Sequence, residues 1–234
     1  IAAGVFSSPY TQETPKSIDQ ISYSRSLAPE YVPYYLLGLR YKRKINTNLS
    51  LTTFLLNGWQ HLEIQRKTPS LGTQLEYTKK KNYINWTSYQ GNEKNDAQPN
   101  FGYRFFTEIS WIYTTNKFKL FACGYTGMQL ISGQAKFWGQ VHFAGEFQLI
   151  KKLLVNARIE QFLDPNNIQI RQGSNHGFNC SGLSLGLHAK VTDFLSLRLE
   201  SRLLLDNSKT GGFIKEGQQT NLLPLGFIGV QLKF

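Results

Sequence analysis

Apolar and polar residues alternate along many stretches of this sequence, including the last one, residues 222–234. Ile228, Val230 and Phe234 occupy one register of this stretch, and Gln231 and Lys233 occupy the other. Alternation with a period of two is typical of a β-strand whose two faces meet different surroundings. Residues 222–234 therefore predict a strand that is long enough to cross the apolar layer of a membrane.

The two registers separate most clearly in the later stretches. In residues 195–205, Leu197 and Leu199 lie on one face, and Arg198 and Glu200 lie on the other. An even count of such strands is typical of bacterial membrane barrels, and we predict an all-β chain with about twelve of them. The predicted strands are residues 1–6, 34–45, 49–59, 71–79, 83–89, 101–113, 118–130, 137–149, 153–163, 183–191, 195–205 and 222–234.

A transmembrane β-barrel fits this pattern better than a water-soluble β-sandwich. Many of the predicted strands run to about ten residues or more, whereas strands of globular proteins usually have about five or six. The apolar register is almost purely aliphatic and aromatic, and the polar register carries charges of both signs. Turning Arg198 or Lys190 toward lipid at mid-depth would cost about 2–4 kcal/mol each. We therefore predict an antiparallel up-and-down barrel with lipid outside and a wet lumen inside.

The connections between the predicted strands alternate between short and long. Outer-membrane barrels have short periplasmic turns and longer outside loops, so this alternation predicts that the C-terminus lies on the periplasmic side. The short turns are residues 46–48, 80–82, 115–117, 151–152 and 192–194. The long connections are residues 7–32, 61–70, 91–100, 165–179 and 207–221, with residues 133–136 as a shorter member of the same set.

Composition narrows the classes of protein that fit. No stretch approaches the roughly 18 apolar residues of a membrane helix, and the aromatic fraction of 14% suits interfacial girdles. The formal charge of +11 raises nucleic acid as a partner, but the basic residues are spread along the chain and kept apart from the apolar register. We therefore predict no nucleic-acid partner. Cys123 and Cys180 lack metal-ligand spacing, and we predict neither a metal nor a cofactor.

Residues 1–6 are too short to cross a membrane, since a spanning strand needs roughly 9–11 residues. A barrel closed with this strand would leave part of a sheet edge unpaired in lipid, which is not viable. We expect that residues 1–234 form one barrel domain and that further N-terminal strands precede Ile1 in the full-length protein.

Several short sequence pieces follow one another in order between residues 3 and 60. They are Gly4-Val5-Phe6, Ser8-Pro9-Tyr10, Glu13, Tyr23-Ser24-Arg25-Ser26, Ala28-Pro29, the strand start at residues 34–38, and Asn57-Gly58-Trp59. In their order and spacing, these pieces resemble the outer-membrane β-barrel porins of Bacteroidota. The resemblance implies a barrel in the outer membrane, in contact with lipid and lipopolysaccharide, and a homo-oligomer or a larger complex is open. It also implies that the terminal Phe234 resembles the signal read by the barrel-assembly machinery.

Two sets of residues are candidates for selecting solutes. The loop of residues 7–32 either folds into the lumen, with Arg25 facing carboxylates across a constriction, or covers the barrel mouth. Its candidate constriction residues are Tyr10, Glu13, Asp19, Tyr23 and Arg25. Basic residues outnumber acidic ones in the polar register, which predicts a preference for anionic solutes, although many of them are expected to form ion pairs within the wall. The pore-lining candidates are Arg40, Lys42, Arg104, Lys119, Arg158, Lys190, Arg198 and Arg202.

The sequence shows no constellation of catalytic residues. His142 invites comparison with the outer-membrane phospholipase, which carries a serine two residues after its histidine, but here that position is Ala144. We predict that the protein is not an enzyme and that it is a porin-like channel for passive diffusion of small hydrophilic, anionic solutes. The alternative is a non-conducting structural or accessory barrel subunit of a larger outer-membrane complex.

Overall fold

The computed structural model describes residues 1–234 except 14–15, 64–67, 171–176, 209–211 and 233–234, so Phe234 lies outside the described residues. Two 3₁₀ turns, η1 (Ser17–Asp19) and η2 (Pro29–Tyr31), lie between the first two strands. The strands are β1 (Ala2–Ser7), β2 (Tyr35–Lys44), β3 (Leu49–Leu56), β4 (Ser70–Lys79), β5 (Asn82–Asn92), β6 (Phe101–Thr114), β7 (Phe118–Ile131), β8 (Gln134–Ile150), β9 (Leu153–Asp164), β10 (Phe178–Lys190), β11 (Leu195–Asp206), β12 (Phe213–Lys215), β13 (Gln218–Thr220) and β14 (Leu222–Leu232).

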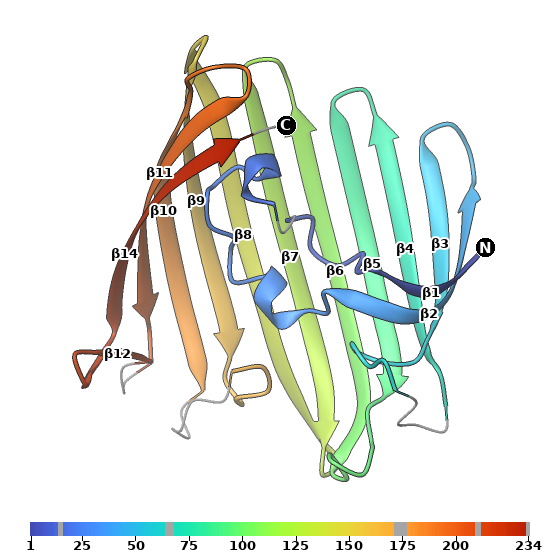
Figure 1. The fold of residues 1–234 in the computed structure, drawn as a ribbon. Coiled ribbons are helices and arrows are strands. Elements are labelled where there is room, and N and C mark those ends of the chain that lie inside the picture. The colour runs from blue at the N-terminus through green and yellow to red at the C-terminus, as the bar shows by residue number, and fades with distance from the viewer. Residues whose placement is uncertain (14–15, 64–67, 171–176, 209–211, 233–234) are drawn as a thin grey trace.

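Twelve of these strands form one antiparallel sheet, which agrees with the predicted number and topology. Each strand pairs with the next along the chain, and β14 pairs with β11. The sheet curves strongly, and Figure 1 looks onto its concave inner face. Within the described residues, β1 and β14 are not paired with each other, so the curved sheet is open between them. β1 has six residues and is as short as predicted.

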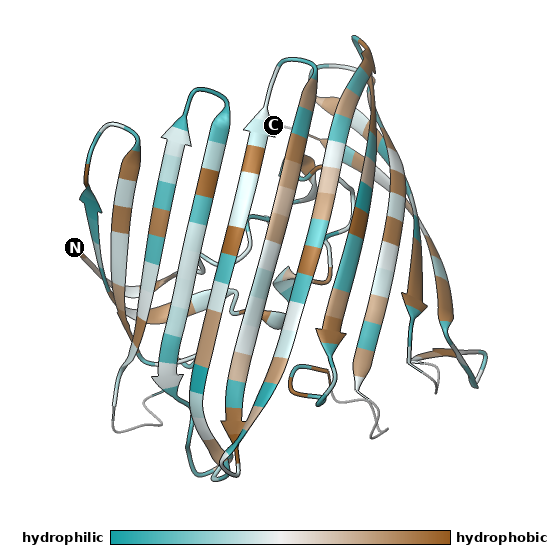
Figure 2. Cartoon of the chain, turned by 180° about the vertical axis from the view of Figure 1, so that it is seen from behind, coloured by the Kyte–Doolittle hydropathy of each residue, from teal (hydrophilic) through white to brown (hydrophobic). Residues whose placement is uncertain are grey.

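The two faces of the sheet are opposite in character to those of a soluble protein. Leucine, isoleucine and phenylalanine side chains project from the outer face, where Leu185 is 59% exposed and Ile159 is 55% exposed. Charged side chains occupy the inner face, where Arg158 and Arg198 are each 1% exposed. Figure 2, which views the molecule from behind, shows the hydrophobic and hydrophilic residues alternating along the strands. Because charge is buried and apolar surface is exposed, the outer face is suited to lipid.

Two connections differ from the prediction. Residues 133–136 are not a loop, because β8 begins at Gln134 and the connection consists of Ser132 and Gly133, with φ of 51° and 79°. Positive φ at both central residues is the mark of a tight hairpin turn, so the expected loop is replaced by two longer strands. The predicted long connection 207–221 contains the small hairpin β12–β13, which turns at Glu216 and Gly217. At the opposite end of the sheet, the connections are short, and β14 runs toward that end (Figure 1).

The connection between β1 and β2, residues 8–34, is here called the inner loop. Figure 1 shows it in front of the concave face, crossing from β1 toward β14 and back. Aromatic side chains anchor its first part, since the Tyr10 ring stacks on Trp59 at 5.4 Å and meets Phe106 at 5.1 Å. Among the described residues, no helix is long and apolar enough to cross a membrane.

Candidate functional site

The inner loop begins its path over the strands in the middle of the sheet. The backbone N–H of Thr11 donates to the Glu108 carboxylate on β6 at 2.6 Å, and Asn85 on β5 donates its side-chain amide to the Pro9 carbonyl at 3.4 Å. Glu108 is fully covered, with 1% exposure. A backbone N–H paired with a buried carboxylate is a charge-assisted hydrogen bond, which is stronger than a neutral one. The structure therefore favours the lumen over the barrel mouth as the position of this loop.

Carboxylates on β9 and β11 hold the far part of the inner loop. Glu200 accepts hydrogen bonds from the Ser24 backbone N–H at 2.6 Å and from the Ser24 hydroxyl at 2.7 Å. Glu160 accepts one from the Leu27 backbone N–H at 2.7 Å. Residues more than 130 positions apart in the chain are joined in this way.

Arginines of the inner face bind the loop carbonyls. Arg158 donates to the Ser24 carbonyl at 2.6 Å, and Arg202 donates to the Arg25 carbonyl at 3.1 Å. Arg198 donates to the carbonyls of Ser17, Gln20 and Ile21. These guanidinium groups satisfy carbonyls that would otherwise be buried without a partner, so their immediate role is to hold the loop.

The predicted ion pairs between strands exist, but they reach across an intervening strand. Arg202 on β11 lies 2.6 Å from the Glu160 carboxylate on β9, with β10 between them. Gly182 on β10 makes this possible, since a β-carbon there would lie 2.6 Å from Cγ of Glu160. Arg158 pairs with Glu200 at 3.4 Å across the same strand. Because Gly182 has no side chain, the side chains of two strands that are not neighbours can form an ion pair above it.

The predicted constriction residues do not form one ring. Glu13 lies 3.9 Å from both Arg158 and His142, and it accepts the backbone N–H of Ser26 at 3.0 Å. The Tyr23 ring approaches Phe227 on β14, with 6.2 Å between centroids. Tyr10 packs among aromatic rings, as described above, and Asp19 is exposed in η1.

Arg25 differs from the prediction that it faces carboxylates across a constriction. Its guanidinium pairs with Glu30 of the same loop at 2.5 Å and lies over the Tyr34 ring at 5.3 Å. The Tyr34 hydroxyl in turn donates to Glu30 at 2.5 Å. Partial burial and this hydrogen bond raise the pKa of Tyr34. Residues five apart in one segment pair with little loss of chain entropy, which explains why the local partner wins.

The eight predicted pore-lining residues fall into two groups. The inner loop or neighbouring side chains bury Arg104, Arg158, Arg198 and Arg202. Arg104, for example, lies between the Trp59 and Trp138 rings at 5.1 and 5.4 Å and donates to Gln129. The other four reach open space, namely Arg40, Lys42, Lys119 and Lys190.

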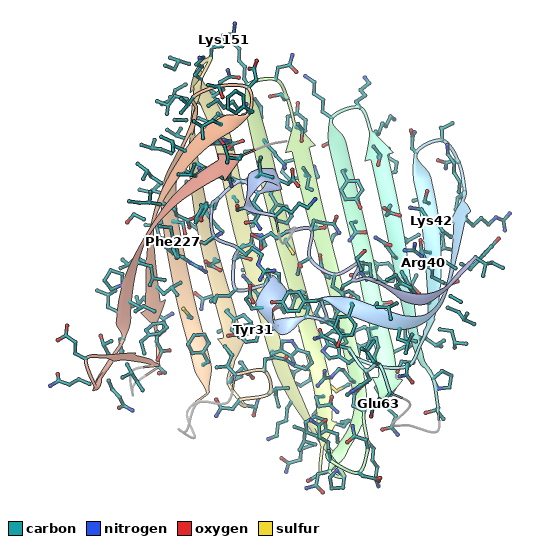
Figure 3. All side chains as sticks on the ribbon, in the orientation of Figure 1. Tyr31, Arg40, Lys42, Glu63, Lys151 and Phe227 are labelled. Carbon is teal, nitrogen blue, oxygen red and sulfur yellow. The ribbon has the colours of Figure 1, made fainter. Side chains whose placement is uncertain are left out.

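Two cavities of similar size remain beside the inner loop. One has a volume of about 500 Å³ and lies against β2–β5, where Arg40 and Lys42 line it. The other has a volume of about 510 Å³ near the ends of β8–β11, and its charged lining consists of three lysines and two carboxylates, namely Lys151, Lys152, Lys190, Glu146 and Asp193. In Figure 3, Arg40 and Lys42 lie near the edge of the sheet formed by β1 and β2, whereas Lys151 lies at the end that carries the short turns. The open space inside the sheet is therefore basic on both sides of the loop.

Lysine and arginine also gather at the end of the sheet that carries the short turns, here called the turn rim. All of these side chains are exposed. Acidic residues are sparse there, with Asp193 as an exposed example. A cluster of one charge sign concentrates counter-ions at an opening. The turn rim consists of Arg43, Lys44, Lys79, Lys80, Lys81, Lys117, Lys151, Lys152 and Lys190.

His142 shows no catalytic partner among the described residues. It is fully buried on the inner face, and its ring meets Phe121 edge-on at 4.8 Å. Cys123 and Cys180 are buried free thiols on β7 and β10. Within the described residues, no cluster of histidine, cysteine and carboxylate groups could hold a metal ion.

A family profile described as "Putative beta-barrel porin-2, OmpL-like" matches residues 1–234. The chain belongs to this family. The match confirms the predicted resemblance to β-barrel porins and the β-barrel fold class, and it agrees with the prediction of a protein that is not an enzyme. The Bacteroidota origin stays a prediction. No curated protein matches the chain significantly.

Solved porins share the fold at low sequence identity. OmpT, an outer-membrane protein of Vibrio cholerae in its trimer form, superposes with a TM-score of 0.59 at 10% identity, covering 98% of this chain and 75% of that one. A porin of 10% identity gives a TM-score of 0.56 and covers 86% of this chain. The match spans only 62% of that porin. These likenesses concern the fold, and together with the family they indicate an outer-membrane β-barrel.

Proposed function

We propose that the protein is a passive outer-membrane channel for small hydrophilic solutes and that it prefers anions. The observation that carries the proposal is the reversal of the two faces, with apolar side chains outside and buried charge inside. A wall of this kind separates lipid from a polar interior. The family match supports the same conclusion.

The anion preference rests on the charges that remain accessible inside the sheet. Glu108, Glu160 and Glu200 are occupied by loop N–H groups and arginines, whereas Arg40 and Lys190 reach the cavities. Basic side chains outnumber carboxylates in both cavity linings. The first has Arg40 and Lys42 against Glu76, and the second has Lys151, Lys152 and Lys190 against Glu146 and Asp193. A net positive charge lowers the energy of an anion in a narrow water-filled space. The turn rim adds positive charge at one mouth. We infer that the inner loop restricts size while the exposed lysines and Arg40 select charge.

The orientation and partners are parts of the same proposal. Short turns face the periplasm in outer-membrane barrels, which supports a periplasmic end for β14. The outer face would contact lipid and lipopolysaccharide, and the barrel-assembly machinery would insert the chain through a signal that includes Phe234. The trimer form of the Vibrio cholerae protein supports a homo-oligomer. We further propose one barrel domain over residues 1–234.

Liposome swelling tests the proposal. Proteoliposomes that contain the folded protein are expected to swell in isosmotic solutions of small sugars, with rates that fall as the sugar grows. Liposomes with heat-denatured protein serve as the control. Swelling rates equal to those of protein-free liposomes, with protein shown to be folded by its strand circular dichroism, would reject the channel.

A non-conducting accessory subunit is the second candidate. The inner loop favours it, because hydrogen bonds at Glu108, Glu160 and Glu200 fix backbone across the interior. This candidate predicts that stoichiometric partners co-purify from native membranes and that swelling is absent. A protein that swells liposomes without partners would reject it.

A further inference from the structure

The cavity beside β2–β5 differs from the other open space because its polar groups converge. The strand register places Lys42 on β2 directly opposite Thr52 on β3, and Thr52 opposite Gln74 on β4. Arg40 lies two residues before Lys42 and therefore projects from the same face. Residues that face each other across paired strands have β-carbons about 4.5–5.5 Å apart. The cavity of about 500 Å³ thus opens onto a compact row of polar and charged side chains.

Charge in this row is only partly compensated. Lys42 pairs with Glu76 at 2.5 Å, and Tyr83 donates its hydroxyl to the same carboxylate at 3.3 Å. Arg40 lies over the Phe6 ring at 5.1 Å and has no carboxylate partner among the described residues. Two cations and one carboxylate leave one net positive charge, and that charge resides on a guanidinium held against an aromatic face. A guanidinium binds a carboxylate through two parallel hydrogen bonds.

Thr52 supplies a second, independent indication of a ligand. It is 3% exposed and lines the cavity, yet its hydroxyl has no hydrogen-bond partner among the described residues. A buried polar atom without a partner is costly, so a ligand hydroxyl that pairs with it gains free energy. Gln74 donates its amide to Asn85 at 2.8 Å and keeps its carbonyl oxygen for a further donor.

We propose that this cavity is a binding site for a small hydroxycarboxylate, in which Arg40 pairs with the carboxylate and Thr52 and Gln74 bond to hydroxyl groups. The net charge of the lining matches a monoanion, and the volume lies within the range of about 300–1,000 Å³ typical of small-molecule pockets. This inference rests on the proposed function and adds to it a class of solute that would bind transiently inside the channel.

Titration calorimetry of the folded full chain in detergent, with gluconate as the probe, tests the site. The expected result is measurable binding that weakens at least about tenfold in R40Q and about threefold in T52V, since a hydrogen bond to a charged group is worth more than one between neutral groups. K94Q removes a positive charge from an exposed position in the β5–β6 connection and is the matched control, with unchanged affinity. Glucose, which lacks the carboxylate, is expected to bind at least about tenfold more weakly.

These experiments can reject the binding site and the channel independently of each other. Calorimetry needs no conduction, so a folded protein that binds gluconate but carries no current would reject the channel and keep the site. A protein that carries current but does not bind gluconate, or whose R40Q variant binds as tightly as the unmodified chain, would overturn the site. In a bilayer, the same affinities are expected to appear as gluconate-dependent interruptions of the current.

Discussion

Removing the Glu160 carboxylate is expected to weaken the attachment of the inner loop to the wall. In E160A, the Leu27 N–H loses its acceptor, and Arg202 loses the carboxylate that lies 2.6 Å away. Arg158 loses its own contact with Glu160 at 3.4 Å but keeps those with Glu200 and Ser24, so the loop loses one of its attachments and not all of them. The change is local, because Glu160 lies on the inner face and packs under the loop.

The size of the effect follows from the burial of the groups left behind. Breaking a buried ion pair by removing one partner costs about 3–5 kcal/mol. About 1.4 kcal/mol corresponds to a factor of ten. A cost of about 3–5 kcal/mol that acts on the attached state alone would therefore populate the detached loop roughly 10² to 4 × 10³ times more often. E160Q keeps an acceptor for Leu27 and is expected to lie between E160A and the unmodified protein.

Single-channel recording provides the assay. E160A is expected to show larger or noisier open-state current than the unmodified protein, and a lower urea midpoint in detergent. E146A is the matched control, because Glu146 is also an inner-face carboxylate. It lies 3.5 Å from His188 and accepts no hydrogen bond from the loop among the described residues. Equal current and equal urea midpoints for E160A and E146A would refute the role assigned to Glu160.

The remaining predictions concern the outer face, the loop aromatics and the turn rim. L185R places a charge on the lipid-facing surface and is expected to destabilise the folded protein by about 2–4 kcal/mol in urea titrations from lipid vesicles, whereas L185F is tolerated; unchanged stability of L185R would contradict the assigned outer face. Burial raises the pKa of Tyr10 well above its usual value, so its contribution to stability is present below pH 10 and is lost as the pH rises through the raised pKa. The urea midpoint is expected to fall at strongly alkaline pH, with a smaller fall in Y10F, and an identical fall in both would argue against this role. Replacing Lys79, Lys80 and Lys81 together by glutamine is expected to lower the anion-to-cation permeability ratio, as measured by reversal potential; an unchanged ratio would remove the turn rim from the selectivity mechanism.

Most of the sheet could be predicted from the period of the sequence. Strands such as β11 alternate so regularly that Leu197 and Arg198 define the outer and inner faces without further information. Period-two alternation does not predict the small hairpin β12–β13, because its strands have only three residues each. The pair Glu216-Gly217, which adopts positive φ at both positions, was the available signal for that turn.

The contacts of the inner loop could not be predicted from the alternation of apolar and polar residues. Periodicity places Arg158 and Arg198 on the inner face. It does not predict that Arg158 donates a hydrogen bond to the Ser24 carbonyl or that Arg198 donates one to the Ser17 carbonyl. Such contacts join positions far apart in the chain and depend on the path of the loop through the interior. The alternation of residues also does not distinguish the arginines that the inner loop buries from those that line open space. This difference decides which side chains can contact a solute.

Reversal potential under a salt gradient tests the central claim most directly. The folded full chain is inserted into a planar lipid bilayer with a higher KCl concentration on one side. Stepwise conductance with a reversal potential of the sign set by chloride permeability is the predicted result. Folded protein that gives no conductance steps would contradict the channel, and a reversal potential of the sign set by potassium would contradict the basic lumen.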